Sequence, residues 1–256
     1  ECKKMGIQLL PPDINEGFAA FSVSGGKIRF GLAAIKSVGR NTIRALVEER
    51  EKNGPFQSLT DFLKRMDNKD LNKRAVESFI KAGAMDSLGG ERSQYMAGYK
   101  GIWDGILSAR KNNLEGQLDL FGFGAQEEET VQLEDALPKV APFPVKEKLA
   151  MEKEVLGIYV SGHPLAEYMD VLQRKVSCQS RDLLAEREED VVADESRVIY
   201  GGVITEKTVK YTRNNKVMCF LKVEDLFGAI EVVVFPNTYE KCNPFLEEDA
   251  IVLVEG

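Results

Sequence analysis

Cysteine and histidine are both scarce in this chain of 256 residues. The chain has one histidine, His163, and its cysteines stand far apart at Cys2, Cys178, Cys219 and Cys242. It therefore lacks the C-x-x-C pairs of zinc sites and the cysteine density of disulfide-rich domains. The sequence argues against a metal or disulfide scaffold, and it favours reduced cysteines in a cytoplasmic protein.

Long apolar runs and paired catalytic carboxylates are missing as well. No apolar run approaches the roughly 20 residues that a membrane-spanning helix needs. There is no Asp-x-Asp pair for two-metal phosphoryl transfer, no P-loop and no nucleophile beside a base. We therefore expect no membrane partner, no bound cofactor and no catalytic residue in this chain. Because it begins at Glu1 and not at a methionine, we also expect it to be part of a longer protein.

Basic residues are concentrated in one half of the chain. The net charge is −7, yet residues 1–115 carry 19 Lys and Arg against 14 Asp and Glu, and residues 116–256 carry 15 against 27. This asymmetry is typical of a nucleic-acid-binding module joined to a module with another role. The acidic second half would also suit a protein-interaction scaffold.

The stretch from Ile28 to Lys52 predicts a helix, a tight turn and a second helix. Gly39 in the turn is expected to adopt a backbone conformation that residues with a Cβ avoid. Backbone N–H groups and the helix dipole at such a corner favour a phosphate, although on its own a short turn is more often a plain connection. The basic neighbours favour nucleic acid. The predicted contacts are Lys36, Ser37, Val38, Gly39, Arg40, Asn41 and Arg44.

A second stretch, Asn72 to Leu88, repeats this order of basic helix, glycine break and apolar segment. The two copies predict a tandem helix-hairpin-helix unit over residues 31–110. The aromatic residues Tyr95, Tyr99 and Trp103 follow helical spacing, so we expect them to pack in a core and not to stack on bases. The predicted contacts of the second hairpin are Lys73, Arg74, Lys81 and Gly83.

Residues 111–148 have the composition of a linker, with several glycines and prolines and the acidic run Glu127–Glu129. The apolar segment 117–121 interrupts it. Such a segment is either a loose flap on its own domain or a docking peptide for another protein, and composition leaves both open. Residues 149–196 follow as a predicted helical connector.

The hydrophobic period changes to two near Val198. Strands at 198–212, 217–223, 230–235 and 250–255, with a helix at about 238–246, predict an oligonucleotide/oligosaccharide-binding (OB) barrel over 197–256 without its last strand. The fold class is therefore α+β and multidomain, with a mainly helical part before a β-barrel. Single-stranded nucleic acid contacts are predicted from the first barrel hairpin, for which a solvated tip is an equal alternative. These residues are Lys210, Tyr211, Arg213 and Lys216.

Several phrases in combination resemble the alpha subunits of bacterial DNA polymerase III, the C-family replicative polymerases. They span the whole chain and read ECKKMGIQLLPPDIN, IRFGLAAIKSVG, NKRAVESFIKAGAMDSL, QLDLF, EKEVLGIYVSGHPL and VVVFPNTYEK. Departures at Ser37, where glycine is common, and at Ile43, where alanine is common, predict a weaker phosphate grip in the first hairpin.

The resemblance implies a role for each part of the chain. Residues 1–30 would end the fingers region, 31–110 would hold duplex primer-template DNA, and 197–256 would lie near the single-stranded template. Gln117, Leu118, Asp119, Leu120 and Phe121 would bind a sliding clamp. Other replicase subunits would be further partners, and Mg²⁺ is expected for the whole polymerase but not for this part. The alternatives are an interaction scaffold or the DNA-gripping module of a nuclease or repair enzyme.

Overall fold

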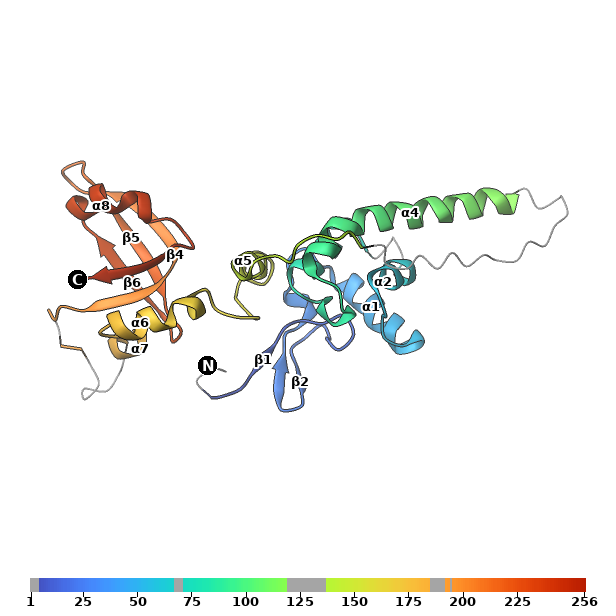
Figure 1. The fold of residues 1–256 in the computed structure, drawn as a ribbon, viewed down its shortest axis with the longest axis horizontal. Helices are drawn as coiled ribbons and strands as arrows, with labels where there is room; N and C mark the ends of the chain where they lie inside the picture. The colour runs from blue at the N-terminus through green and yellow to red at the C-terminus, as the bar shows by residue number, and fades with distance from the viewer. Residues whose placement is uncertain (1–4, 67–70, 119–136, 185–191, 194) are drawn as a thin grey trace. The chain divides into compact units, whose positions relative to one another are not determined.

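The chain divides into two compact units, Glu1–Ser161 and Gly162–Gly256. The computed structural model describes residues 5–66, 71–118, 137–184, 192–193 and 195–256, with only the backbone described at 111–118 (Figure 1). The division falls inside the range 149–196 that the sequence suggested as a connector.

The first unit begins with a small sheet ordered β1-β3-β2. Strands β2 (Ser22–Ser24) and β3 (Lys27–Arg29) are antiparallel, and β1 (Leu9–Leu10) pairs with β3 in parallel. Gly25 and Gly26 join β2 to β3 with φ values of 56° and 75°. A two-residue turn of this kind needs positive φ at both positions, which glycine adopts without steric cost. The two glycines therefore account for the position of this β2–β3 hairpin.

Helices make up most of the first unit. Ser58 accepts a hydrogen bond from the N–H of Asp61 at the start of α2, and Asn72 accepts one from the N–H of Ala75 at the start of α3. These side chains satisfy N–H groups that a helix leaves unpaired at its N-terminus, so they fix where the helices begin. The elements are η1 (Leu32–Ala34), α1 (Arg40–Asn53), α2 (Leu59–Arg65), α3 (Lys73–Lys81), η2 (Asp86–Leu88), α4 (Arg92–Leu118) and α5 (Val145–Leu156).

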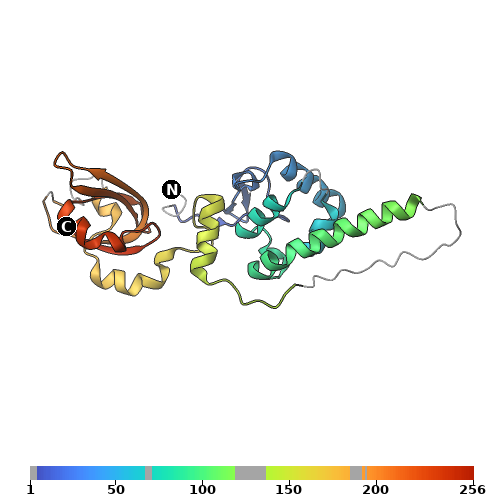
Figure 2. The same ribbon diagram turned by 90° about the horizontal axis from the view of Figure 1, so that it is seen from above.

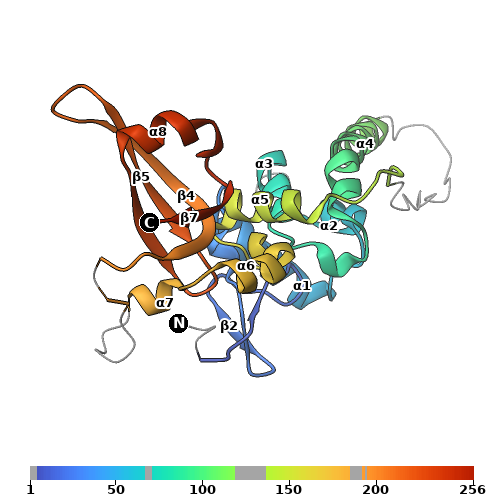
Figure 3. The same cartoon turned by 60° about the vertical axis from the view of Figure 1, so that its left-hand side comes forward.

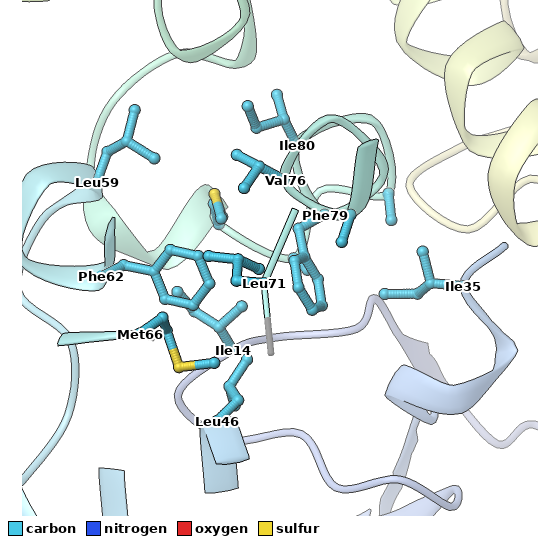
Figure 4. Packing of buried hydrophobic residues seen from close by; sticks show 14 of the residues in the cluster. Ile14, Ile35, Leu46, Leu59, Phe62, Met66, Leu71, Val76, Phe79 and Ile80 are labelled. Atoms are coloured by element: carbon cyan, nitrogen blue, oxygen red, sulfur yellow. The ribbon is translucent and has the colours of Figure 1, made fainter. Parts of the chain in front are cut away.

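One hydrophobic core holds these helices together (Figure 4). Phe62 is fully buried in it and packs edge-to-face against Phe56 and Phe79. Tyr95 and Tyr99 on α4 are also buried, so the aromatic stripe belongs to the core as expected. A large buried area of this kind supplies the main driving force for folding the unit.

Helix α4 is longer than expected. We predicted that it would end at Arg110, where a linker would begin, but it continues to Leu118 (Figure 2). The segment 111–118 contains no proline and only one glycine. An isolated glycine lowers helix stability without ending a helix, so composition alone placed the boundary too early.

The second unit is a helical segment followed by an antiparallel sheet ordered β6-β5-β4-β7. The four strands match the predicted ones to within two residues at each end, and the curled sheet is the expected open half of a barrel (Figure 3). The elements are η3 (Pro164–Tyr168), α6 (Met169–Lys175), α7 (Ser180–Leu183), β4 (Ile199–Tyr211), β5 (Val217–Glu224), β6 (Ala229–Val234), α8 (Pro236–Cys242), η4 (Asn243–Phe245) and β7 (Ile251–Glu255).

A separate core fills one side of this sheet. Ile204, Cys219 and Leu221 lie in it, together with Leu246, which follows α8. The register between β4 and β5 shifts between Ile204 and Glu206, the mark of a β-bulge. The bulge reverses the alternation of faces along β4. It therefore decides which residues in the second half of β4 face the core side of the sheet.

Candidate nucleic-acid interface

The turn of the first hairpin lies between η1 and α1, and its left-handed residue is Ser37. Ser37 has a φ of 67°, whereas Gly39 has a φ of −77° and a ψ of 151°, which is ordinary extended backbone. We expected Gly39 to need the conformation that a Cβ disfavours, and this was wrong. The chain reverses two residues earlier, after the buried side chain of Ile35, and Gly39 serves as the N-cap of α1.

The predicted contact residues of the first hairpin lie at one exposed corner of the first unit. Lys36, Arg40 and Arg44 are exposed, and Val38 is half-buried against the core. Helix α1 begins without a side-chain cap and without an acidic residue in its first turn. The positive dipole end of α1 therefore lies beside three exposed cations, and this combination attracts anions. Ser37, Gly39 and Asn41 complete the exposed set.

Arg44 is only weakly engaged within the protein. Its guanidinium lies 3.4 Å from Oδ1 of Asn41 and 4.0 Å from Oε1 of Glu48, and both members of the ion pair are about 70% exposed. Exposed pairs at this separation contribute little because water and salt screen them. The charge of Arg44 thus remains available to a ligand.

The second hairpin places its predicted residues differently. Gly83 has a φ of 75°, and its N–H donates to the carbonyl of Ile80 (3.0 Å). A Cβ at this position would lie 2.2 Å from Nη2 of Arg92. Gly83 is therefore the left-handed residue that directly follows the C-cap of α3, Ala82, and its N–H is used within the fold. The N–H of Gly83 is therefore not available to a phosphate in the way that was predicted for the second hairpin.

Two of the three basic residues of the second hairpin are paired with carboxylates. Nζ of Lys73 lies 2.7 Å from Asp104, and Nζ of Lys81 lies 2.7 Å from Glu154 on α5. Arg74 is exposed. The two hairpins are thus similar in sequence but differ in available charge. The first exposes its cations to solvent, whereas two of the three cations of the second are paired with carboxylates.

A buried ion network lies behind the second hairpin, and the sequence gave no sign of it. Arg92 at the start of α4 donates to Asp86 (2.7 Å) and to Glu152 on α5 (3.0 Å). Arg92 is 4% exposed and Glu152 is fully buried. Burial lowers the pKa of the Arg92 guanidinium, but the bonds to the two carboxylates outweigh it, so the pKa is raised overall. The Arg92 guanidinium therefore stays charged.

The predicted barrel residues lie on two faces of the sheet and at the hairpin tip. In an antiparallel pair, residues directly opposite each other share a face. Tyr211 pairs with Val217 and shares the core side of the sheet, where it is 73% exposed beyond the core. Lys210 pairs with Met218 on the outer side. Arg213 and Lys216 lie in the exposed turn, which Thr212 closes by accepting the N–H of Lys216 with its hydroxyl (3.1 Å).

The outer side of the sheet also carries residues that the sequence analysis missed. Nζ of Lys210 lies 4.5 Å from the ring centre of Phe220, and Phe220 pairs with the exposed Val233. Lys222 lies on the same side and forms an ion pair with Glu206 (3.0 Å). A cation over an aromatic ring at an exposed sheet face is suited to base stacking and phosphate contact. Period-two alternation could have indicated this face, had the bulge in β4 been recognised.

The predicted clamp-binding residues can be placed only in part. Gln117 and Leu118 form the C-terminal end of α4, while Asp119, Leu120 and Phe121 lie outside the described residues. Within the described ranges, no cluster of three or more His, Cys, Asp or Glu residues could hold a metal ion, and no helix is long and apolar enough to cross a membrane.

Comparison with known proteins supports both parts of the fold. The family described as a helix-hairpin-helix motif matches residues 6–95, and the family described as an OB-fold nucleic acid binding domain matches residues 198–256. The chain is 39% identical to DNA polymerase III subunit alpha of Thermus aquaticus over 99% of its length, 38% to that of Aquifex aeolicus over 100%, and 36% to that of Vibrio cholerae over 100%. It spans 20%, 20% and 22% of these proteins.

Proposed function

We propose that this chain, which is homologous over its whole length to one segment of the alpha subunit of bacterial DNA polymerase III, is a DNA-holding part of that subunit. In this proposal the chain holds DNA next to a sliding clamp. Its helix-hairpin-helix and OB-fold domains are nucleic-acid-binding types. The proposed partners are duplex primer-template, single-stranded template, the clamp and other replicase subunits. The proposed location is the cytoplasm.

The first hairpin carries the proposed duplex contact. The observation that supports it is the uncapped N-terminus of α1 beside Lys36, Arg40 and Arg44, all of them exposed. Backbone N–H groups and flexible cations recognise phosphates and do not distinguish bases. A polymerase needs such a contact because it must hold any sequence. The second hairpin would contribute mainly through Arg74, with Lys73 and Lys81 only where DNA displaces their carboxylate partners.

The OB-fold unit is proposed to contact single-stranded template with the outer side of its sheet. Lys210 and Phe220 would provide a cation and a stacking surface there, and Arg213 and Lys216 would reach the backbone from the hairpin tip. Stacking tolerates every base, so this contact would also be independent of sequence. Tyr211 lies on the other side of β4, and a strand bound across the outer side would not reach it directly.

The clamp contact is proposed from sequence. Gln117 to Phe121 combines one glutamine with three large apolar residues, and its first two residues end α4. A peptide of this kind binds by placing its apolar side chains in a pocket, which must offset the entropy lost on ordering. Binding to DNA through the hairpins would raise the effective concentration of the motif near a clamp on the same DNA.

Salt titration tests the nucleic-acid part of the proposal. Fluorescence anisotropy should show the purified 256-residue chain binding a primer-template duplex, with log K falling linearly as log salt concentration rises. Contacts to at least three phosphates predict a slope of about −2.7 or steeper. Absence of binding at low salt would refute this role and favour a pure interaction scaffold. Metal-dependent cleavage of the DNA would instead favour a nuclease.

Replacing Leu120 and Phe121 together by alanine tests the clamp contact. We expect clamp binding to disappear in surface plasmon resonance, because the two side chains provide most of the apolar area that the motif can bury. DNA affinity of the same variant should be unchanged, since neither residue lies in a hairpin. An unaltered clamp affinity would rule out the proposed motif.

A further inference from the structure

We propose that helix α5 is a structural part of the DNA-binding corner and that Glu152 is the positioning residue that holds it there. This inference rests on the duplex contact proposed above. Helix α5 (Val145–Leu156) lies outside both matched segments, 6–95 and 198–256. Its role therefore does not follow from either family description.

Helix α5 makes a direct backbone contact with the first hairpin. The carbonyl of Val155 accepts a hydrogen bond from the N–H of Lys36 (2.9 Å). Lys36 immediately precedes Ser37, whose left-handed backbone reverses the chain. The side chains of Val155 and Leu156 are buried in the same core as Ile35. The last turn of α5 thus fixes the residue at which the phosphate-binding turn begins.

Glu152 lies one turn before Val155, on the same face of the helix. It is fully buried and accepts three hydrogen bonds. Oε1 accepts from Arg92 (3.0 Å), and Oε2 accepts from the backbone N–H groups of Val160 and Ser161 (both 2.9 Å). These bonds connect α5 to the start of α4 and to the segment of chain that follows α5. A rotation or shift of α5 would break all three.

The chemistry of the site allows only a carboxylate. All three partners are donors, so each one must face an acceptor. A glutamine at this position would bring one NH₂ group, and in either orientation that group would face a donor. Because the site is closed to water, the mismatch cannot be relieved by solvation, and α5 must move. The expected consequence is a displaced carbonyl of Val155 and a loosened turn at Lys36.

Glu152→Gln and Glu154→Gln form a matched pair of variants. They remove the same charge two residues apart on one helix, but Glu154 is exposed and pairs only with Lys81 in the described structure. Electrostatics alone predicts equal or tighter duplex binding for both, since each loses a negative charge. Positioning predicts that Glu152→Gln binds the duplex at least about tenfold more weakly, whereas Glu154→Gln does not. Equal affinities for the two variants would overturn the proposal.

Amide hydrogen exchange provides a readout that does not depend on DNA. At a temperature where circular dichroism shows every variant folded, exchange at Lys36 should be at least about tenfold faster in Glu152→Gln than in the unmodified chain, while exchange at Ile80 in α3 is unchanged. A uniform acceleration at both amides would reduce Glu152 to a general stability role and refute the inference.

Arg92→Lys is a second test in case Glu152→Gln does not fold. It keeps the total charge but loses the planar fork that reaches Asp86 and Glu152 together. It should weaken duplex binding and accelerate exchange at Lys36; normal behaviour in both would contradict the inference. If the unmodified chain fails to bind duplex DNA, the proposed function is lost, while exchange at Lys36 still decides whether Glu152 positions the turn.

Discussion

Replacing Lys36, Arg40 and Arg44 together by glutamine is expected to weaken binding to a primer-template duplex a few hundredfold at about 0.1 M salt. Each phosphate contact adds about 0.9 to the slope of log K against log salt concentration, so the loss of three contacts removes about 2.7 from that slope. The three side chains are exposed and lie around the uncapped start of α1. Their replacement should leave the core intact, and fluorescence anisotropy over a salt series would measure both quantities.

The second hairpin provides the matched control. Replacing Lys73, Arg74 and Lys81 by glutamine removes the same three charges, but Asp104 and Glu154 already neutralise two of them. We therefore expect the slope to fall by only about 1, which corresponds to roughly a tenfold loss at the same salt concentration. Equal losses from the two hairpins would mean that DNA separates the ion pairs and that the hairpins contribute alike.

Gly83→Ala is expected to destabilise the first unit by about 3 kcal/mol or more. The left-handed backbone alone costs about 1 kcal/mol with a Cβ present. The larger part arises because that Cβ would lie 2.2 Å from Nη2 of Arg92 and 2.9 Å from Oδ2 of Asp86. Arg92 is 4% exposed and cannot swing into solvent, so the buried ion network with Glu152 must be distorted.

Gly89→Ala separates the two contributions. Gly89 has a φ of 86°, close to that of Gly83, but a Cβ there would meet no described atom within 4 Å. We expect this variant to lose only about 1 kcal/mol, the cost of the backbone conformation. Urea unfolding followed by fluorescence would measure both, because the single tryptophan, Trp103, is buried in α4 and reports on the first unit alone. Equal losses in the two variants would show that the ion network adapts.

Local structure was largely predictable from the sequence. Ser58 and Asn72 indicate where helices begin, because each supplies a side-chain acceptor for an N–H group of the first turn. The Gly25–Gly26 pair indicates the β2–β3 hairpin, and alternation indicates the four strands of the second unit. Each of these signals acts within a few residues of chain, so a sequence read in order contains it. The end of α4 was missed because glycine weakens a helix without stopping it.

The composition of the candidate site was also predictable, but its arrangement was not. The basic residues of both hairpins were identified from the sequence, yet nothing in it shows that Lys81 pairs with Glu154, 73 residues later, while Arg40 has no acidic residue in its own first helical turn. The bulge in β4 likewise decides that Lys210 and Phe220 share one face. A single-residue shift moves every later side chain to the other face of a strand.

By itself, the sequence determined the starts of α2 and α3, the four strands of the second unit, the burial of the aromatic residues on α4 and the excess of cations in the first half of the chain, because periodicity and capping are local properties of the polypeptide. Only the tertiary structure decided that the two hairpins differ in available charge, that Ser37 and not Gly39 reverses the chain, and that the buried Glu152 holds α5 against Lys36. The physical reason is that charge pairing and burial depend on which distant residues meet, and that is settled when the core closes and not along the chain.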